Sequence, residues 1–162
     1  MATTLGSSIF DESQLPRLTT QLASLKLILD DASRVAIDRR SPSGKWSARE
    51  NIAHVGRYHE IFLARVRRIV TELAPTFQRY RAEEDPDWPA WASLPVEEIQ
   101  RRLVGLRAAL IHEIRAIRPG DLSRIGVHSS FGRMSLNLWV EFFLVHEAHH
   151  LYIVLERLRE QS

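Results

Sequence analysis

The stretch KWSARENIAHVGRYHEIFLARVRRIVTEL, residues 45–73, is the part of this chain that most clearly indicates its fold. It opens with Ser47 and Glu50 in the arrangement of a capping box, in which each side chain accepts a hydrogen bond from the other residue's backbone N–H. Apolar residues then recur at spacings of three and four, with His59 in one apolar position; they are Ile52, Val55, Phe62, Val66, Ile69 and Leu73. The stretch therefore predicts one long amphipathic helix that ends before Pro75.

Three further segments show the same helical period. The first follows Pro16, a residue suited to the first turn of a helix, and is predicted to run to about Asp38. Another covers Val96 to Ile114, and the last is predicted to start at a Ser135 cap and to run nearly to the C-terminus. Four helices of roughly 20–30 residues predict an all-α fold, an antiparallel four-helix bundle.

The segments between these helices lack a helical period. Residues 80–95 are rich in acidic residues and proline and contain Trp88 and Trp91, which favours a structured surface loop. Residues 124–133 read as a turn. Neither segment alternates apolar and polar residues for long enough to predict a strand.

The composition indicates a single globular domain, residues 1–162, with 44% hydrophobic and 26% charged residues. Lysine and arginine number 22 against 20 acidic residues, and the resulting charge of only +2, with arginines scattered, argues against a nucleic-acid partner. The absence of cysteine excludes thiolate ligands and a cysteine nucleophile. The first ten residues lack a secretory signal pattern and no segment reads as a membrane span, so we expect a cytoplasmic protein with no membrane partner.

Histidine is the residue type that points to a functional site. Residues 146–150 read HEAHH, and on a helix His146 and His150 share one face while His149 points elsewhere. The pair lies on an apolar stripe, where buried imidazoles need a polar partner such as a metal ion. The alternative is an ordinary pair of exposed or hydrogen-bonded histidines. His54 is a candidate third ligand if the second and fourth helices are neighbours, and three histidines would leave an open position on the ion.

Two segments resemble the DinB/YfiT-like superfamily of metal-binding four-helix bundles. KWSARENIAH (45–54) is similar to the opening of the family's second helix. HSSFGRMS (128–135), followed by Trp139 and then HEAHHL (146–151), is similar to the family's matching loop and fourth helix. Both motifs occur in the family's order, so the resemblance spans most of the chain.

The resemblance implies a divalent metal, zinc or nickel, held by His54, His146 and His150. The chain departs from the family just after these ligands, where residues 151–153 (LYI) stand in place of the usual glutamine. The same histidines with Glu147 also match the HExxH pattern of zinc proteases, but only twelve residues follow His150, too few for the further ligand helix of that class.

The resemblance further implies an activity, because characterised relatives include transferases and isomerases that use low-molecular-weight thiols. We expect a metal-dependent thiol S-transferase, or a related hydrolase, acting on a small electrophilic substrate with any thiol supplied as a cosubstrate. Glu147, His149 and Tyr58 are the candidate catalytic residues for proton transfer or ligand orientation, with packing or solvent-facing roles as the alternative. The candidate aromatic walls of a substrate cavity, or else ordinary core residues, are Trp88, Trp91, Trp139 and Phe143.

A second class of function stays open at this point. The alternative is a non-catalytic helical protein with a structural or vacant metal site, whose exposed face serves homodimerisation or binds a stress-response partner. Metal content and the effect of removing His54 would separate the two classes. A DNA-binding role is the least favoured, because it requires a clustered basic surface.

Overall fold

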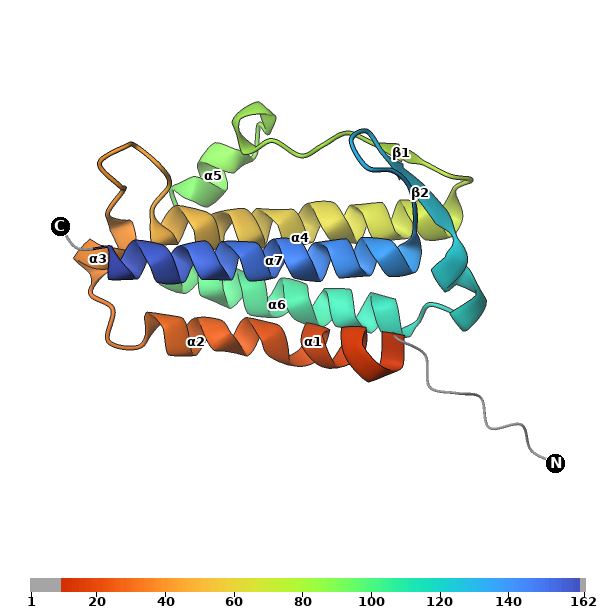
Figure 1. The fold of residues 1–162 in the computed structure, drawn as a ribbon, viewed down its shortest axis with the longest axis horizontal. Helices are drawn as coiled ribbons and strands as arrows, with labels where there is room; N and C mark the ends of the chain where they lie inside the picture. Colours follow the sequence, from red (N-terminus) through yellow and green to blue (C-terminus); the bar gives the residue numbers. More distant parts are fainter. Residues whose placement is uncertain (1–9, 161–162) are drawn as a thin grey trace.

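The computed structural model describes residues 10–160, so most of the N-terminal stretch without a signal pattern lies outside the described residues. The α-helices are α1 (Leu15–Thr20), α2 (Ser24–Leu29), α3 (Arg34–Asp38), α4 (Ala48–Thr71), α5 (Trp88–Ala92), α6 (Val96–Arg115) and α7 (Leu136–Arg159). Shorter helical turns of other types are η1 (Phe10–Gln14), η2 (Gln21–Ala23), η3 (Ala82–Glu84) and η4 (Pro119–Ser123). The α1–α2 segment, α4, α6 and α7 form a four-helix bundle, in which α1 and α2 together take the place of the first long helix (Figure 1). This confirms the predicted fold class. No helix within residues 10–160 combines the length and apolar character needed to cross a bilayer.

The directions of the helices depart from a simple antiparallel bundle. Helices α4 and α7 lie antiparallel, but residues 72–95 run back along the outside of the bundle, so α6 points the same way as α4 (Figure 1). The ion pair between Arg67 and Glu113 accordingly joins the C-terminal parts of both helices. Similarly, Arg17 pairs with Glu141 near the starts of α1 and α7, which run parallel. The long connection therefore reverses the expected direction of the third helix.

The predicted continuous helix up to Asp38 is wrong. A short 3-10 turn separates α1 from α2, the chain leaves the helix at Asp30, and Asp31 has a φ of 61°. Aspartate tolerates this left-handed conformation better than most residues because its short polar side chain can bond to the nearby backbone. Ser33 then caps α3 by accepting a hydrogen bond from the N–H of Ala36. Helix α2 therefore ends at Asp30 and Asp31, and the Ser33 cap starts α3.

A small sheet was not predicted. Its strands are β1 (Thr76–Phe77), β2 (Ile125–His128) and β3 (Gly132–Ser135), so the interpretation of residues 124–133 as a turn alone is wrong. Strand β2 pairs in parallel with β1 and antiparallel with β3. Gly126 brings the backbone of β2 against Trp139, whose indole Nε1–H donates to the Gly126 carbonyl at 3.3 Å. The sheet is thereby fixed over the end of the bundle where α4 ends and α7 begins (Figure 1).

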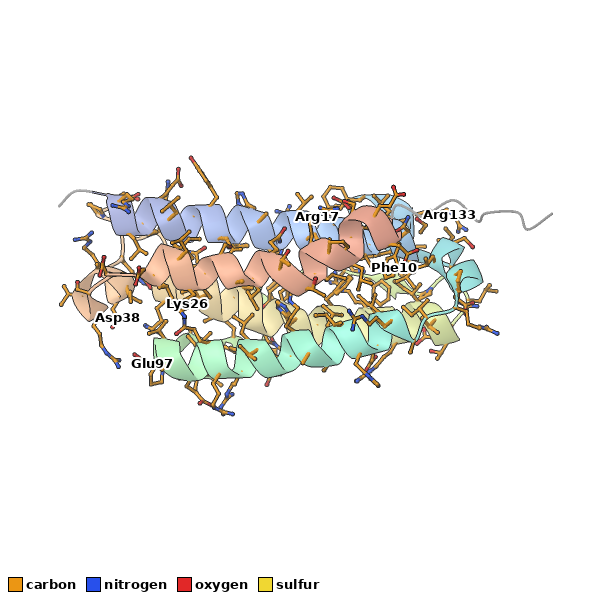
Figure 2. The ribbon with its side chains drawn as sticks, turned by 90° about the horizontal axis from the view of Figure 1, so that it is seen from below. Phe10, Arg17, Lys26, Asp38, Glu97 and Arg133 are labelled. Carbon is orange, nitrogen blue, oxygen red and sulfur yellow. The ribbon has the colours of Figure 1, made fainter. Side chains whose placement is uncertain are left out.

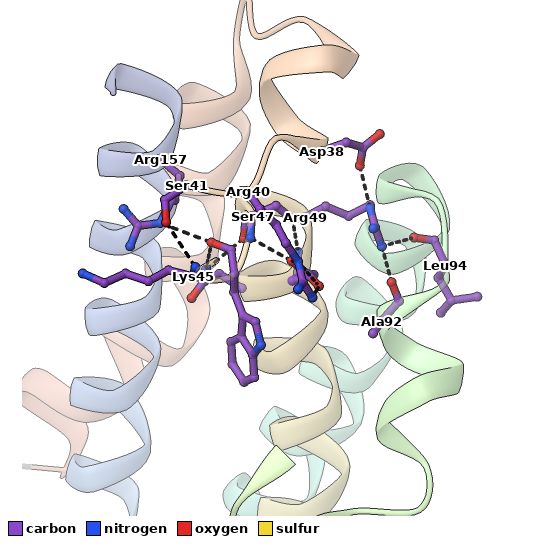
Figure 3. Close-up of polar contacts among 12 residues, drawn as sticks. Asp38, Arg40, Ser41, Lys45, Ser47, Arg49, Ala92, Leu94 and Arg157 are labelled. Carbon is purple, nitrogen blue, oxygen red and sulfur yellow. Dashed lines mark hydrogen bonds and ion pairs between the residues drawn. The ribbon is translucent and has the colours of Figure 1, made fainter. Parts of the chain in front are cut away.

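The start of α4 is anchored as the capping box predicts. The Ser47 hydroxyl accepts from the N–H of Glu50 at 3.1 Å, and the N–H of Ser47 donates to the Glu50 carboxylate at 2.8 Å. Arg40 forms an ion pair with the same carboxylate. Arg49 donates to Asp38 at 2.6 Å and also reaches the loop before α6 (Figure 3). These contacts fix the first turns of α4, which carry part of the candidate site.

Side chains fill the space between the helices, as Figure 2 shows. One buried cluster surrounds Phe62 and Phe143, and a second surrounds Ile52 and Trp91. Trp91 belongs to α5, which lies in the segment predicted as a surface loop. Its ring packs directly on the backbone of Gly56 in α4. A glycine in mid-helix is therefore explained by the close approach of an indole ring.

Replacing Gly56 by alanine is expected to destabilise the protein by about 1–3 kcal/mol, because the new methyl group would lie 2.8 Å from Cη2 of Trp91 and closer still to Cζ3. Gly105 in α6 is the matched control, since a Cβ there meets nothing within 4 Å. Its replacement by alanine should stabilise the helix by up to about 1 kcal/mol. Urea unfolding of both variants provides the measurement, and equal effects at the two positions would contradict the packing argument.

Candidate metal centre

Helices α4 and α7 bring three predicted ligands together. His54 lies on α4, and His146 and His150 lie one turn apart on α7. The Nε2 atoms of His54 and His146 are 3.2 Å apart, and one ligand atom from each of the three residues lies within 4.8 Å of the others. Two nitrogen ligands at about 2.1 Å from an ion, at tetrahedral or octahedral angles, are about 3.0–3.4 Å apart. The His54–His146 separation therefore matches that of two ligands of one ion, and His150 lies close enough to be the candidate third.

Burial keeps these imidazoles in the form that binds metal. Desolvation lowers the pKa of His54 from 6.5 to about 4 and, with help from neighbouring histidines, that of His150 to about 3. Desolvation also lowers the pKa of His146 well below its ordinary value. The buried Nδ1 of His54 has no hydrogen-bond partner among residues 10–160. Three neutral rings with so few polar partners are a costly arrangement that a bound cation would compensate.

Asn51 orients one of the ligands. Its Oδ1 lies 2.9 Å from Nδ1 of His150, and its amide group donates to the Ser47 carbonyl at 2.9 Å, which fixes the amide so that Oδ1 faces the imidazole. Nδ1 of His150 must then carry the proton, and Nε2 presents its lone pair. Asn51 was not among the residues predicted from the sequence, although its position one turn before His54 was a usable signal.

Replacing Asn51 by leucine is expected to weaken zinc binding by about 10–100-fold, because His150 loses the acceptor that fixes its tautomer. Asn51→Asp is the matched control, since it loses the donor to Ser47 but keeps an acceptor oxygen for His150, and it should retain affinity. Isothermal titration with zinc measures both variants, and circular dichroism checks that they fold. Equal losses in the two variants would show that Asn51 acts through the helix start and not through His150.

The three histidines open onto a cavity of about 430 Å³. Two of the candidate catalytic residues, Tyr58 and His149, line it, together with the aromatic residues Tyr80, Phe131 and Phe142. Of the two roles considered for Trp88, Trp91, Trp139 and Phe143, that of cavity wall is not supported, because none of them lines it. The last three are buried in the core, which is the alternative role, and Trp88 packs against Trp46 beside His54.

Tyr58 is placed to donate a hydrogen bond and not to act as a base. Burial raises its pKa to about 12, so the hydroxyl stays protonated at neutral pH. Nη1 of Arg65 donates to the hydroxyl oxygen at 3.2 Å. The ring packs against that of His146, with centroids 4.2 Å apart. Tyr58 therefore holds His146 in place and offers a hydroxyl at the edge of the cavity.

Glu147 does not line the cavity. It is 1% exposed, forms an ion pair with Arg107 of α6, and accepts from Gln21 at 3.0 Å. In the HExxH interpretation this glutamate would act beside the metal. Here it lies in the bundle core, where its contacts with Arg107 and Gln21 join α7 to α6 and to the α1–α2 segment. These contacts are those of a packing residue, and a part for Glu147 in proton transfer stays a prediction.

The lowered pKa values predict how the metal-free protein responds to acid. Between about pH 6.5 and pH 4 the unfolded chain binds protons at His54 and His150 that the folded chain does not bind. The contribution of these two histidines to the free energy of unfolding is therefore complete above about pH 6.5. It is lost as pH falls, by up to about 1.4 kcal/mol per pH unit for each histidine. Urea unfolding between pH 7.5 and pH 5 tests this, with a shallower slope expected for His54→Gln. A flat profile would show that the rings are not desolvated.

Comparison with known proteins gives a consistent family assignment. The model of the DinB superfamily matches residues 17–154. A protein of Oceanobacillus iheyensis, named provisionally as a metal-dependent hydrolase, is 27% identical over 142 residues, covering 85% of this chain and 76% of its own. The structure of YfiT from Bacillus subtilis, described in the same provisional terms and as a four-helix bundle of unusual topology, has a TM-score of 0.79 at 18% identity. That likeness covers 98% of this chain and 92% of YfiT.

Proposed function

The chain belongs to the DinB superfamily, and on this premise we propose that it is a metal-dependent hydrolase of a small electrophilic substrate. The observation that carries the proposal is the convergence of His54, His146 and His150 on one side of an open cavity. The name of the Oceanobacillus iheyensis relative supports the same class of reaction. Zinc and nickel are the metals that we propose, because imidazole donors suit both.

The ligand set determines what a bound ion would contribute. A divalent ion held by three neutral imidazoles keeps its charge and supplies a Lewis acid that activates water and polarises a substrate carbonyl. Asn51 holds His150 in the ligating tautomer, and Tyr58 packs against His146. His149 lines the cavity without being one of the three ligands, so its imidazole is the available group for proton transfer to or from a substrate.

Thiol transfer is the alternative reaction for the same site. The described cavity is large enough for a small cosubstrate, and the chain itself has no cysteine, so any thiol has to enter from solution. A thiol would use the same Lewis-acid centre in place of water. The two reactions therefore differ in the nucleophile that is consumed, which an assay can separate.

The experiment compares zinc-loaded protein, metal-free protein and His54→Ala with two substrates. Hydrolysis of 4-nitrophenyl acetate reports attack by water, and conjugation of a low-molecular-weight thiol to 1-chloro-2,4-dinitrobenzene reports transfer. We expect ester hydrolysis that requires zinc and is lost in His54→Ala. Zinc-dependent conjugation without hydrolysis would assign the transfer reaction. Activity that is equal with and without metal would overturn the proposal.

A further inference from the structure

The side of the cavity formed by the small sheet carries groups that the proposed metal centre does not use. Arg79 follows β1, His128 ends β2, and Ser130 lies in the turn between β2 and β3. All three line the same cavity as the ligand histidines. The ring of Phe142 lies between the two sides, 5.8 Å from the ring of His128 and 6.3 Å from that of His146. A small molecule in the cavity therefore meets both sets of groups.

The Arg79 guanidinium is available to a ligand. Most arginines of the bundle are paired with carboxylates, as in Arg57 with Asp85 and Arg67 with Glu113. Arg79 forms no ion pair or side-chain hydrogen bond with any residue between 10 and 160, and only its backbone N–H is used, in a hydrogen bond to Ser129. A planar guanidinium with free N–H groups matches the geometry of a carboxylate or phosphate.

His128 supplies a second donor, and its orientation is fixed. The backbone N–H groups of Ser130 and Phe131 donate to its Nδ1 at 3.0 and 3.3 Å, so Nδ1 is unprotonated and the ring proton is on Nε2. Burial, together with Arg65 and Arg79, lowers the pKa of this histidine, which keeps the ring neutral. Its side chain is nearly fully buried, yet Nε2–H has no partner within residues 10–160. The unused N–H belongs to a ring that lines the cavity.

The other residues that line the cavity also favour a ligand with a negative charge and an apolar body. No aspartate or glutamate from the described part of the chain lines this cavity. Asp85, which accepts from the hydroxyl of the lining residue Tyr80, is neutralised by Arg57. Phe131 and Phe142 give the same space an apolar surface. The cavity is thus arranged for a molecule with a negatively charged group and an apolar body.

We propose that this cavity selects small organic anions, with a carboxylate or phosphate group bound by Arg79, His128 Nε2–H and Ser130 on the sheet side. The inference rests on the proposed function, since it names the substrate class of the same site. The anionic group would be held at the sheet while the reactive bond faces His54, His146 and His150. Charge-assisted hydrogen bonds of this kind give both affinity and orientation.

The test uses three probes of similar size: phenylacetate, phenyl phosphate and the uncharged phenylacetamide. Binding is measured by isothermal titration to metal-free and to zinc-loaded protein. We expect at least one anion to bind at least about tenfold more tightly than the amide in both forms, and Arg79→Gln to remove that preference. Arg133→Gln is the matched control, because Arg133 is an exposed arginine of the same sheet that does not line the cavity, and it should retain the preference. Which anion binds more tightly distinguishes carboxylate from phosphate.

The outcomes separate this inference from the proposed function. Equal binding of anions and amide by the wild-type protein would overturn the inference, even if zinc-dependent ester hydrolysis were observed. A preference that survives in Arg79→Gln but disappears in His54→Ala would also overturn it, because the anion would then bind at the metal. Conversely, an Arg79-dependent preference without any hydrolysis would support the binding site and count against the hydrolase.

Discussion

Replacing His54 by alanine is expected to lower the zinc affinity of the protein by at least about 100-fold. The variant loses one of three converging ligands, whereas loss of a group that only orients a ligand already costs about 10–100-fold. Wild-type protein purified without a histidine tag should hold one zinc ion per chain after dialysis, and His54→Ala should hold far less. Metal analysis by mass spectrometry and isothermal titration provide the measurement.

Stability offers an independent measure of the same effect. A ligand present at about 1,000 times its dissociation constant stabilises the folded state by about 4 kcal/mol, so zinc should raise the melting temperature of the wild-type protein clearly. We expect this rise to be much smaller in His54→Ala and unchanged in His112→Ala, which removes an exposed histidine of α6 outside the cavity. If both variants bind and respond to zinc like the wild-type protein, the three histidines do not form a metal site.

Short sequence patterns predicted those features of the fold that depend on residues close together along the chain, such as helix starts. The capping box at Ser47 and the serine cap at Ser135 mark the starts of α4 and α7 in the structure. The spacing of His146 and His150 placed both rings on one face of a helix. His54 was a candidate only if the second and fourth helices are neighbours, and the family resemblance is what implied it as the third ligand. Helical periodicity and spacing therefore predicted the pair on α7, and the resemblance added His54.

The other half of the cavity depends on contacts between distant segments. Strand β1 has two residues and pairs with β2 some 50 positions further along the chain, so neither strand shows the alternation that predicts a sheet. Arg79 and His128 therefore could not be assigned to the cavity from the sequence. The sequence could not decide between the two roles of the tryptophans for a related reason, because Trp91 fills a gap that exists only where Gly56 exposes the backbone of α4.

Replacing Glu147 by alanine is expected to destabilise the protein by about 3–5 kcal/mol without removing the metal site. Glu147 is 1% exposed and neutralises Arg107, which is 6% exposed and whose Nε and Nη1 have no other partner among residues 10–160. Without the carboxylate, a guanidinium is left in the bundle core with no opposing charge, and that is the costly state. For a domain of this size the melting temperature should fall by about 10 °C.

The double variant Arg107→Met with Glu147→Met distinguishes a lost ion pair from lost packing. Because it removes both charges and keeps much of the side-chain volume, it should be more stable than Glu147→Ala. Zinc stoichiometry should stay at one in both variants, since neither Glu147 nor Arg107 lines the cavity. If the Glu147→Ala variant folded normally but lost ester hydrolysis, the result would instead support the HExxH interpretation, in which this glutamate acts as the general base.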